Sequence, residues 1–250
     1  MNVLLTGLAG AGKSRLTASL GGWLQRVQGF EVCYVNLDAG AESLPYSANV
    51  DIRDFVRVDR IMREEGLGMN GAIVLAAERS VGLLGEVISA ISARNAEFNL
   101  IDSPGQQEIF IFRDYGPKTA EALQRHQQTI ALHVIDAPLA QTPSQLATAL
   151  MLATTSHLRL AVRTLSVVNK IDLGDAERID ALLSDPRAMR RMIEQERAGA
   201  ITDMAMALLG YVEQMMIVQR PIMVSAATNE GISGLYKAIN EAMCACGDLT

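Results

Sequence analysis

The sequence has few cysteines, no long apolar run and no leader of the secretory type. Three cysteines in 250 residues are too few for a framework of disulfide bonds and fit a reducing compartment. The apolar stretches fall far short of the roughly 20 residues that a membrane-spanning helix needs. The amino terminus leads straight into a glycine-rich stretch, without the basic segment and apolar core of a signal peptide. We therefore expect a cytoplasmic protein with no membrane partner.

The sequence also lacks any run of basic residues. Asp and Glu outnumber Lys and Arg by 28 to 22, which gives a formal net charge of -6 at pH 7. Proteins that bind a phosphate backbone usually present a basic patch, so we expect no direct contact with nucleic acid. Cys244 and Cys246 lie close together, but no second Cys/His pair stands at zinc spacing. This favours ordinary packing for the pair over a metal site.

Short apolar runs alternate with longer amphipathic stretches along the chain. This alternation is typical of βα units and predicts an α/β fold with a mostly parallel sheet flanked by helices. We expect one domain over residues 1–250, with a helical insertion at about 175–219. The predicted strands are 3–6, 32–36, 98–101, 129–135, 164–169 and 222–224. The other predicted helices are 13–28, 71–94, 144–163 and 232–243.

A glycine-rich loop follows the first predicted strand. Residues 7–14 match GxxxxGK(S/T) between an apolar strand and an amphipathic helix, the context that a phosphate-binding P-loop requires. Backbone N–H groups and the positive end of the helix would face the phosphates. Lys13 is expected to reach the β and γ oxygens, and Ser14 to bind Mg²⁺. The chain is thus predicted to be a P-loop NTPase that holds nucleotide phosphates with Gly10, Ala11, Gly12, Lys13, Ser14 and Arg15.

A second motif, Asn169-Lys170-Ile171-Asp172, follows a predicted strand and resembles the guanine-binding motif of GTPases. The Asp172 carboxylate can accept hydrogen bonds from guanine N1–H and the exocyclic amine, whereas adenine would leave the charge unpaired. Asn169 is expected to tie this loop to the phosphate loop, and the stem of Lys170 to lie along the base.

The turn Ser225-Ala226-Ala227 follows the last predicted strand and resembles the GTPase loop that contacts the guanine oxygen through its backbone. Ala227 stands where a lysine is usual. Together the two motifs predict GTP and GDP as ligands.

A third motif, Asp102-Ser-Pro-Gly105, resembles the DxxG switch of GTPases. There the aspartate holds Mg²⁺ through water and the glycine N–H meets the γ-phosphate. Gln106 and Glu108 follow where a polar side chain could orient the attacking water, and Asp38 ends the second strand. Asp38 could instead cap a turn and Glu108 a helix start, and we favour catalytic roles for both. Mg²⁺ is the expected cofactor, with Ser14, Asp38 and Asp102 as its protein ligands.

These motifs, spread over nearly the whole chain, together resemble those of the GPN-loop GTPases. The segment 36–46 contributes to this resemblance, and the tail 246–250 is similar to the archaeal branch. The Gly-Pro-Asn motif of the family would fall within residues 66–72, where Met69 replaces the proline before Asn70. That replacement removes a fixed φ and adds an N–H, so the loop is expected to be less preorganised.

In this family two protomers face each other, and the GPN loop of one reaches the γ-phosphate of the other. The resemblance therefore implies a homodimeric, nucleotide-dependent switch in which Asn70 acts in trans while Asp38, Gln106 and Glu108 arrange the water. Eukaryotic relatives are linked to RNA polymerase II, so a client protein complex is a further partner that the resemblance suggests.

Three alternatives stay open from the sequence. A P-loop kinase would transfer the γ-phosphoryl group to a small acceptor, and Arg190 and Arg191 offer the one hint of an arginine-rich lid. A metallochaperone GTPase would need a Cys/His cluster near the switch, which the sequence does not contain. A scaffold would bind nucleotide without turnover, against which Asp38, Gln106 and Glu108 argue.

Overall fold

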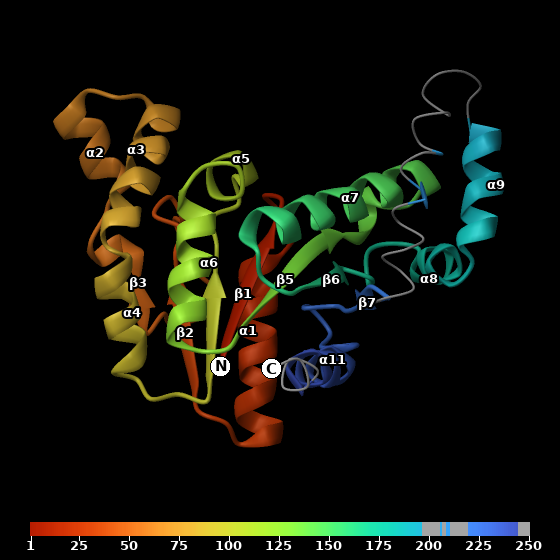
Figure 1. Cartoon of the computed structure of the whole chain (residues 1–250), viewed down its shortest axis with the longest axis horizontal. Coiled ribbons are helices and arrows are strands. Elements are labelled where there is room, and N and C mark those ends of the chain that lie inside the picture. The colour runs from red at the N-terminus through yellow and green to blue at the C-terminus, as the bar shows by residue number, and fades with distance from the viewer. Residues whose placement is uncertain (197–205, 207–208, 211–219, 245–250) are drawn as a thin grey trace.

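The computed structural model describes residues 1–196, 206, 209–210 and 220–244, and within them a seven-stranded sheet lies between two layers of helices (Figure 1). Neighbouring strands pair in parallel in the order β3-β2-β4-β1-β5-β6-β7, which confirms the predicted α/β fold. The unpredicted strand is β3, whose two residues show no pattern; β7 is equally short, but a motif turn follows it. The strands are β1 (Asn2–Gly7), β2 (Val32–Asn36), β3 (Val50–Asp51), β4 (Phe98–Asp102), β5 (Thr129–Asp136), β6 (Thr164–Asn169) and β7 (Ile222–Met223).

The central strand β1 is buried on both faces, and its side chains alternate between two cores. Val3 and Leu5 pack with α1 (Lys13–Trp23) and α11 (Ile232–Cys244) on one face. Leu4 packs with α4 (Leu84–Ser92) and α6 (Tyr115–His126) on the other. This two-residue period is the reason that an unbroken apolar run can form the middle of a sheet covered by helices.

A third cluster covers the β6 end of the sheet and includes side chains from α7 (Pro143–Leu160), α8 (Ala176–Ser184) and α9 (Pro186–Glu196). A capping box begins α7, where the Thr142 hydroxyl accepts from the Gln145 N–H. Ala161, with φ of 51°, ends it. The predicted helical insertion thus begins with α8 and α9. Residues 197–205, 207–208 and 211–219 of that insertion lie outside the described residues, as does the tail at 245–250.

The predicted helix at 71–94 is wrong as a single helix. It is divided at Leu83, whose ψ of 2° is not helical, into α3 (Met69–Gly82) and α4. The break lets α3 pack on α2 (Val58–Glu65) while α4 packs on the sheet. One straight helix could not pack against both α2 and the sheet, because the two surfaces lie in different directions.

Several elements were not predicted at all. They are α2, α5 (Gln107–Phe110), α6, and the 3₁₀ turns η2 (Ile52–Asp54) and η3 (Ala137–Leu139). The predicted helix at 13–28 is present as α1 followed by a π-helical turn, η1 (Leu24–Gln28).

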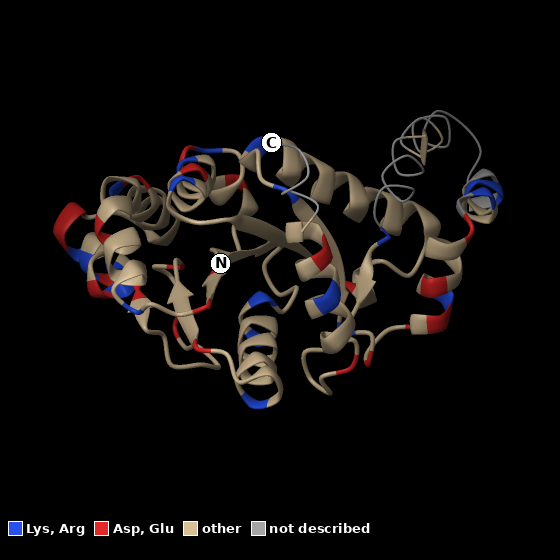
Figure 2. Cartoon of the chain, turned by 60° about the horizontal axis from the view of Figure 1, so that its bottom comes forward, with Lys and Arg blue, Asp and Glu red and all other residues tan. Residues whose placement is uncertain are grey.

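Charged side chains of both signs are mixed over the outer helices in the view of Figure 2. On the α2–α3 hairpin they form exposed ion pairs, such as Arg60 with Glu64 and Arg79 with Glu65. Among the described residues, none of the helices combines the length and apolar character that a bilayer span requires.

Candidate nucleotide site

The predicted motif residues gather at one edge of the sheet, where the parallel strands end. In the register of the sheet, Asp102 at the end of β4 pairs with Asn36 of β2 and with Leu5 of β1. Asp136 of β5 pairs in the same way with Asn169 of β6. Ligands of open α/β sheets bind at this carboxyl edge, so residues far apart in sequence share one site.

The phosphate loop ends where α1 begins. Gly12 has φ of 90°, and none of the described side chains caps the helix here, which leaves N–H groups for an anion. A Cβ at Gly12 would lie 2.5 Å from Nδ2 of Asn169, so glycine permits this close approach. Arg15, also predicted to hold nucleotide, is exposed in the first turn of α1.

Lys13 is buried and its ammonium folds back onto the phosphate loop. Its Nζ donates to the carbonyl oxygens of Gly7 at 3.0 Å and Leu8 at 3.1 Å. Burial lowers the pKa of Lys13, and the carboxylates of Asp102 and Asp38 work in the opposite direction. The cation therefore lies close enough to both predicted metal-site carboxylates to be stabilised by them, and its positive charge would attract an incoming phosphate.

Asp102 and Ser14 offer oxygen atoms that suit Mg²⁺. Asp102 is buried, its Oδ2 accepts from the Tyr46 hydroxyl at 2.9 Å, and its Oδ1 has no partner among the described residues. Burial raises the pKa of Asp102, while hydrogen bonds from the Ser14 and Tyr46 hydroxyls oppose that rise. Mg²⁺ takes one or two protein oxygens and completes its shell with water and phosphate, so this pair fits the ion.

Asp38, Gly105 and Gln106 line one cavity of about 180 Å³ beside the phosphate loop. Asp38 Oδ1 accepts from the N–H of Gly40 at 2.9 Å, so this side chain holds its own turn as well as facing the cavity. Glu108 does not line the cavity and is exposed in the first turn of α5. The geometry thus groups two of the predicted water-orienting residues and places the third at a helix start.

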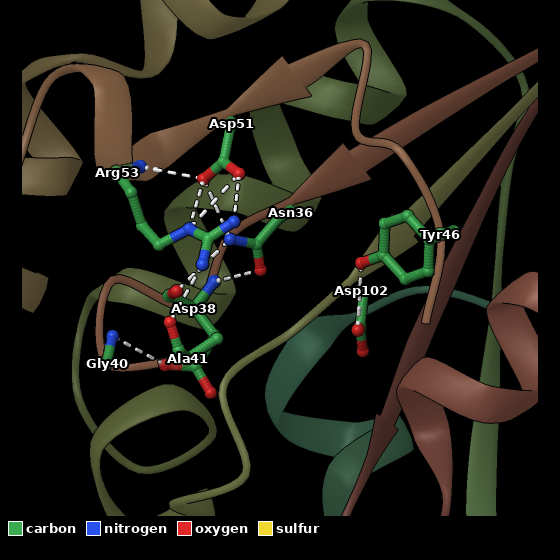
Figure 3. Close-up of polar contacts among 8 residues, drawn as sticks. All are labelled: Asn36, Asp38, Gly40, Ala41, Tyr46, Asp51, Arg53 and Asp102. Atoms are coloured by element: carbon green, nitrogen blue, oxygen red, sulfur yellow. Dashed lines mark hydrogen bonds and ion pairs between the residues drawn. The ribbon is translucent and has the colours of Figure 1, made fainter. Parts of the chain in front are cut away.

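A partly buried polar network that the sequence did not reveal braces the Asp38 turn (Figure 3). Asn36 Nδ2 donates to the Asp38 carbonyl and to Asp51 Oδ1, and Asn36 Oδ1 accepts from the Asp38 N–H. Arg53 pairs with Asp51 and donates to the carbonyl of Ala41 at 2.9 Å. Burial works against the ionised Asp51, yet hydrogen bonds from Arg53 and Asn36 keep its pKa below the usual value. The charged residues at 51–54 were the only sequence signal for this network, but they match no recognised motif.

Asn169 joins the phosphate loop to the guanine side of the site. Its Nδ2 donates to the Ala11 carbonyl at 3.0 Å, which is the link that the sequence predicted, and its Oδ1 accepts from the Ala226 N–H. The buried Ser225 hydroxyl donates to Asp172 Oδ1 at 2.5 Å, and Asp172 itself is exposed. The Asp172 carboxylate, which is predicted to bind guanine, is therefore oriented by Ser225 and remains accessible to a ligand from solvent.

Lys170 forms an ion pair with Asp136; the sequence analysis predicted Lys170 as a site residue but not Asp136. Lys170 has φ of 65°, and its Nζ donates to Asp136 Oδ2 at 2.8 Å. This ion pair fixes the lysine stem next to the phosphate loop. Asp136 was missed because it ends β5 without a motif around it.

Asn70 lies apart from the residues above. It is exposed in the first turn of α3, after the N-cap Gly68, and does not line the cavity of Asp38. The preceding Met69 is 55% exposed. The segment predicted as a loop at 66–72 is thus a short turn followed by the first residues of α3, and Met69 lines a second pocket with Gly40 and Arg53.

Comparison with known proteins adds the family. A family model described as "Conserved hypothetical ATP binding protein" matches residues 5–245. The GPN-loop GTPase PAB0955 of Pyrococcus abyssi is 33% identical, with all of both chains covered. The GPN-loop GTPase QQT2 of Arabidopsis thaliana is 28% identical over 82% of this chain and 54% of its own length. The crystal structure of apo PAB0955 superposes with a TM-score of 0.87, covering 98% of each chain at 30% identity. With its phosphate loop, DxxG switch and Asn-Lys-x-Asp loop meeting at one sheet edge, the chain belongs to the GPN-loop GTPase family, a family of GTP-binding proteins.

Proposed function

We propose that the chain binds GTP with Mg²⁺ and hydrolyses it to GDP and phosphate. The observation that supports this most strongly is the pair of hydrogen bonds made by the Asn169 side chain, one to the Ala11 carbonyl and one from the Ala226 N–H. It sets the guanine loop at a fixed distance from the phosphate loop, as a ligand with both a base and phosphates requires. Asp172 then decides the base, because guanine offers two adjacent donors, N1–H and the exocyclic amine, in an arrangement that adenine lacks.

Each group at the phosphate end has a distinct role in this proposal. Lys13 exchanges its two carbonyl partners for phosphate oxygens, so the buried cation is not left without a partner. Ser14 and Asp102 hold Mg²⁺, which supplies charge stabilisation to the β and γ oxygens. Asp38 and Gln106 orient the attacking water in the cavity that they share.

The experiment that tests the proposal compares nucleotides and follows the product. The parent chain should prefer GTP over ATP and release phosphate to water without an added acceptor. Asp172→Asn should reduce the ratio of GTP to ATP affinity by about 10-fold or more, since it exchanges a carboxylate acceptor for an amide. An unchanged ratio would show that Asp172 does not choose the base, and a clear preference for ATP would favour the description of the matching family model.

The proposal extends to a homodimer in which Asn70 serves the site of the partner subunit. Its support is the exposure of Asn70 on the α2–α3 hairpin, away from its own cavity. Such a dimer would act as a nucleotide-dependent switch, with assembly of a protein complex as its cellular task in the cytoplasm.

The dimer is tested by mixing two inactive variants. Asn70→Ala should still bind GTP yet hydrolyse it on the order of 10²-fold more slowly, as expected for a lost transition-state donor. Lys13→Ala has a damaged pocket but an intact Asn70. Adding an excess of it should restore part of the activity in mixed dimers. If mass measurement shows mixed dimers and no activity returns, action in trans is wrong.

A further inference from the structure

Tyr46 connects the loop between β2 and β3 to the buried carboxylate of Asp102. Its hydroxyl donates to Asp102 Oδ2 at 2.9 Å, and Figure 3 shows the phenol pointing at this carboxylate. Asp102 Oδ1 is buried with no hydrogen-bond partner in the described part of the chain. The two oxygens of one carboxylate thus have different surroundings, since Tyr46 holds Oδ2 while Oδ1 has no partner among the described residues.

The ring of Tyr46 is held by a second tyrosine. It stacks on Tyr34 of β2, with ring centroids 5.4 Å apart and planes at 20°. The Tyr34 hydroxyl donates to Gln25 Oε1 at 3.1 Å. Tyr34 also packs closely on α1, because a Cβ at Gly21 would lie 2.4 Å from its ring. The stack therefore has a firm base on the strand and on the first helix.

The loop that carries Tyr46 is anchored on the same strand residue. Asn49 Oδ1 accepts from the backbone N–H of Tyr34 at 2.8 Å, and the Asn49 N–H donates to the Tyr34 carbonyl at 2.8 Å. A shift of the loop would break these bonds and the ring stack together. The position of the Tyr46 hydroxyl is therefore set by several independent contacts instead of by one.

A hydroxyl that donates to a carboxylate fixes the orientation of that carboxylate and favours its charged form. We propose that Tyr46 is a positioning residue for Mg²⁺, holding Asp102 Oδ2 so that Oδ1 stays available to the hydration shell of an ion at Ser14. This inference rests on the proposed function, since it concerns the metal of the same site. It also makes metal affinity depend on the order of the loop that follows Asp38.

The test measures Mg²⁺ affinity directly. Calorimetric titration of Mg²⁺ into the GDP complex of Tyr46→Phe should give a dissociation constant about 10-fold higher than that of the parent, or about 1.4 kcal/mol. GDP affinity in EDTA should not change, because the ring and its stack remain. Tyr34→Phe is the matched control, since it removes a hydroxyl from the same ring pair without touching Asp102, and it should bind Mg²⁺ like the parent.

A double variant decides whether the effect passes through Asp102. In an Asp102→Asn background, Tyr46→Phe should cause no further loss of Mg²⁺ affinity. An equal loss in both backgrounds would overturn the proposal, as would unchanged or tighter Mg²⁺ binding by Tyr46→Phe alone. A parent chain that binds no guanine nucleotide even with Mg²⁺ would instead overturn the proposed function, and this inference with it.

Discussion

Two regions of the molecule carry the motifs of one site but are built in opposite ways. At the sheet edge, Lys13, Asp102 and Asn169 are buried, and backbone or hydroxyl groups hold their side chains. On the α2–α3 hairpin, Asn70 is exposed, and ion pairs such as Arg79 with Glu65 lie open to solvent. Buried polar groups must keep their partners or lose stability, whereas exposed groups can exchange theirs for water.

The polar groups of the sheet edge are thus buried and hydrogen-bonded, whereas the hairpin presents Asn70 to solvent. Small apolar contacts between Ala72, Ala76 and Ile61 hold the two hairpin helices together, so its body is ordered although its tip is open. Preorganised donors favour binding and chemistry, whereas an exposed side chain is accessible to a second molecule, as the proposed dimer requires. The predictions below separate the two regions.

The largest effect is expected from Lys13→Ala. The variant removes the cation at the β and γ oxygens, and GTP affinity or turnover should fall by about 10²-fold or more. Equilibrium binding and phosphate release under single-turnover conditions measure the two quantities. Lys118→Ala, which removes an exposed lysine paired with Asp114 on α6, should behave like the parent. Parent-like hydrolysis by Lys13→Ala would place the phosphate site elsewhere.

Two buried asparagines, Asn169 and Asn36, allow the nucleotide-binding and the Asp38 sides of the sheet edge to be tested separately. Asn169→Ala and Asn36→Ala each remove a buried amide and leave backbone partners unsatisfied, so each should lower the free energy of unfolding by about 2 to 3 kcal/mol. Urea denaturation measures that loss. Asn169→Ala should also weaken GTP binding, whereas Asn36→Ala should mainly slow hydrolysis through the Asp38 turn. Identical effects on binding and rate would show that the two networks are not separate.

His133 makes the stability of the sheet edge depend on pH. It is buried on β5 beside Thr6, and burial, with the charge of Lys13, lowers its pKa to about 4. The unfolded chain takes up this proton below about pH 6.5 and the folded chain only below about 4, so the free energy of unfolding falls as pH drops through that window. The expected loss from His133 between pH 7.5 and 5 is about 2 kcal/mol.

Urea denaturation at a series of pH values checks the His133 prediction. His133→Gln should flatten the pH dependence of stability by that amount. His126→Gln, on the surface of α6, should keep the slope of the parent. Equal slopes for His133→Gln and the parent would contradict a neutral, buried His133.

The smallest effect is expected on the hairpin. Arg79→Ala breaks the ion pair with Glu65 that joins α3 to α2, where the two side chains are 41% and 43% exposed. Solvent screening limits its contribution to about 0.5 kcal/mol or less, and the difference from the parent should vanish at high salt. Thermal denaturation at two ionic strengths measures it. A loss of several kcal/mol would mean that the hairpin is braced more like the sheet edge.

The sequence predicted six of the seven strands and the helices at 13–28, 144–163 and 232–243 because each has a sustained period or a motif at its end. It missed β3 and α5, whose two and four residues are too short to show a period, and it also missed the longer helices α2 and α6. It also joined α3 to α4, because apolar periodicity continues through Leu83 while the direction of packing changes there.

The candidate site likewise has features that local sequence determined and features that it did not. Consecutive residues by themselves determined the chemistry offered at each strand end, since strand, turn and helix preferences and motif spacing are local properties. Only the tertiary structure decided which ends meet. Asn169 reaches Ala11 across 158 residues and Tyr46 reaches Asp102 across 56, and no local pattern operates over such separations. Sheet order and the burial of polar groups select those partners, because an unpaired buried group would cost more than the loop entropy of bringing its partner there.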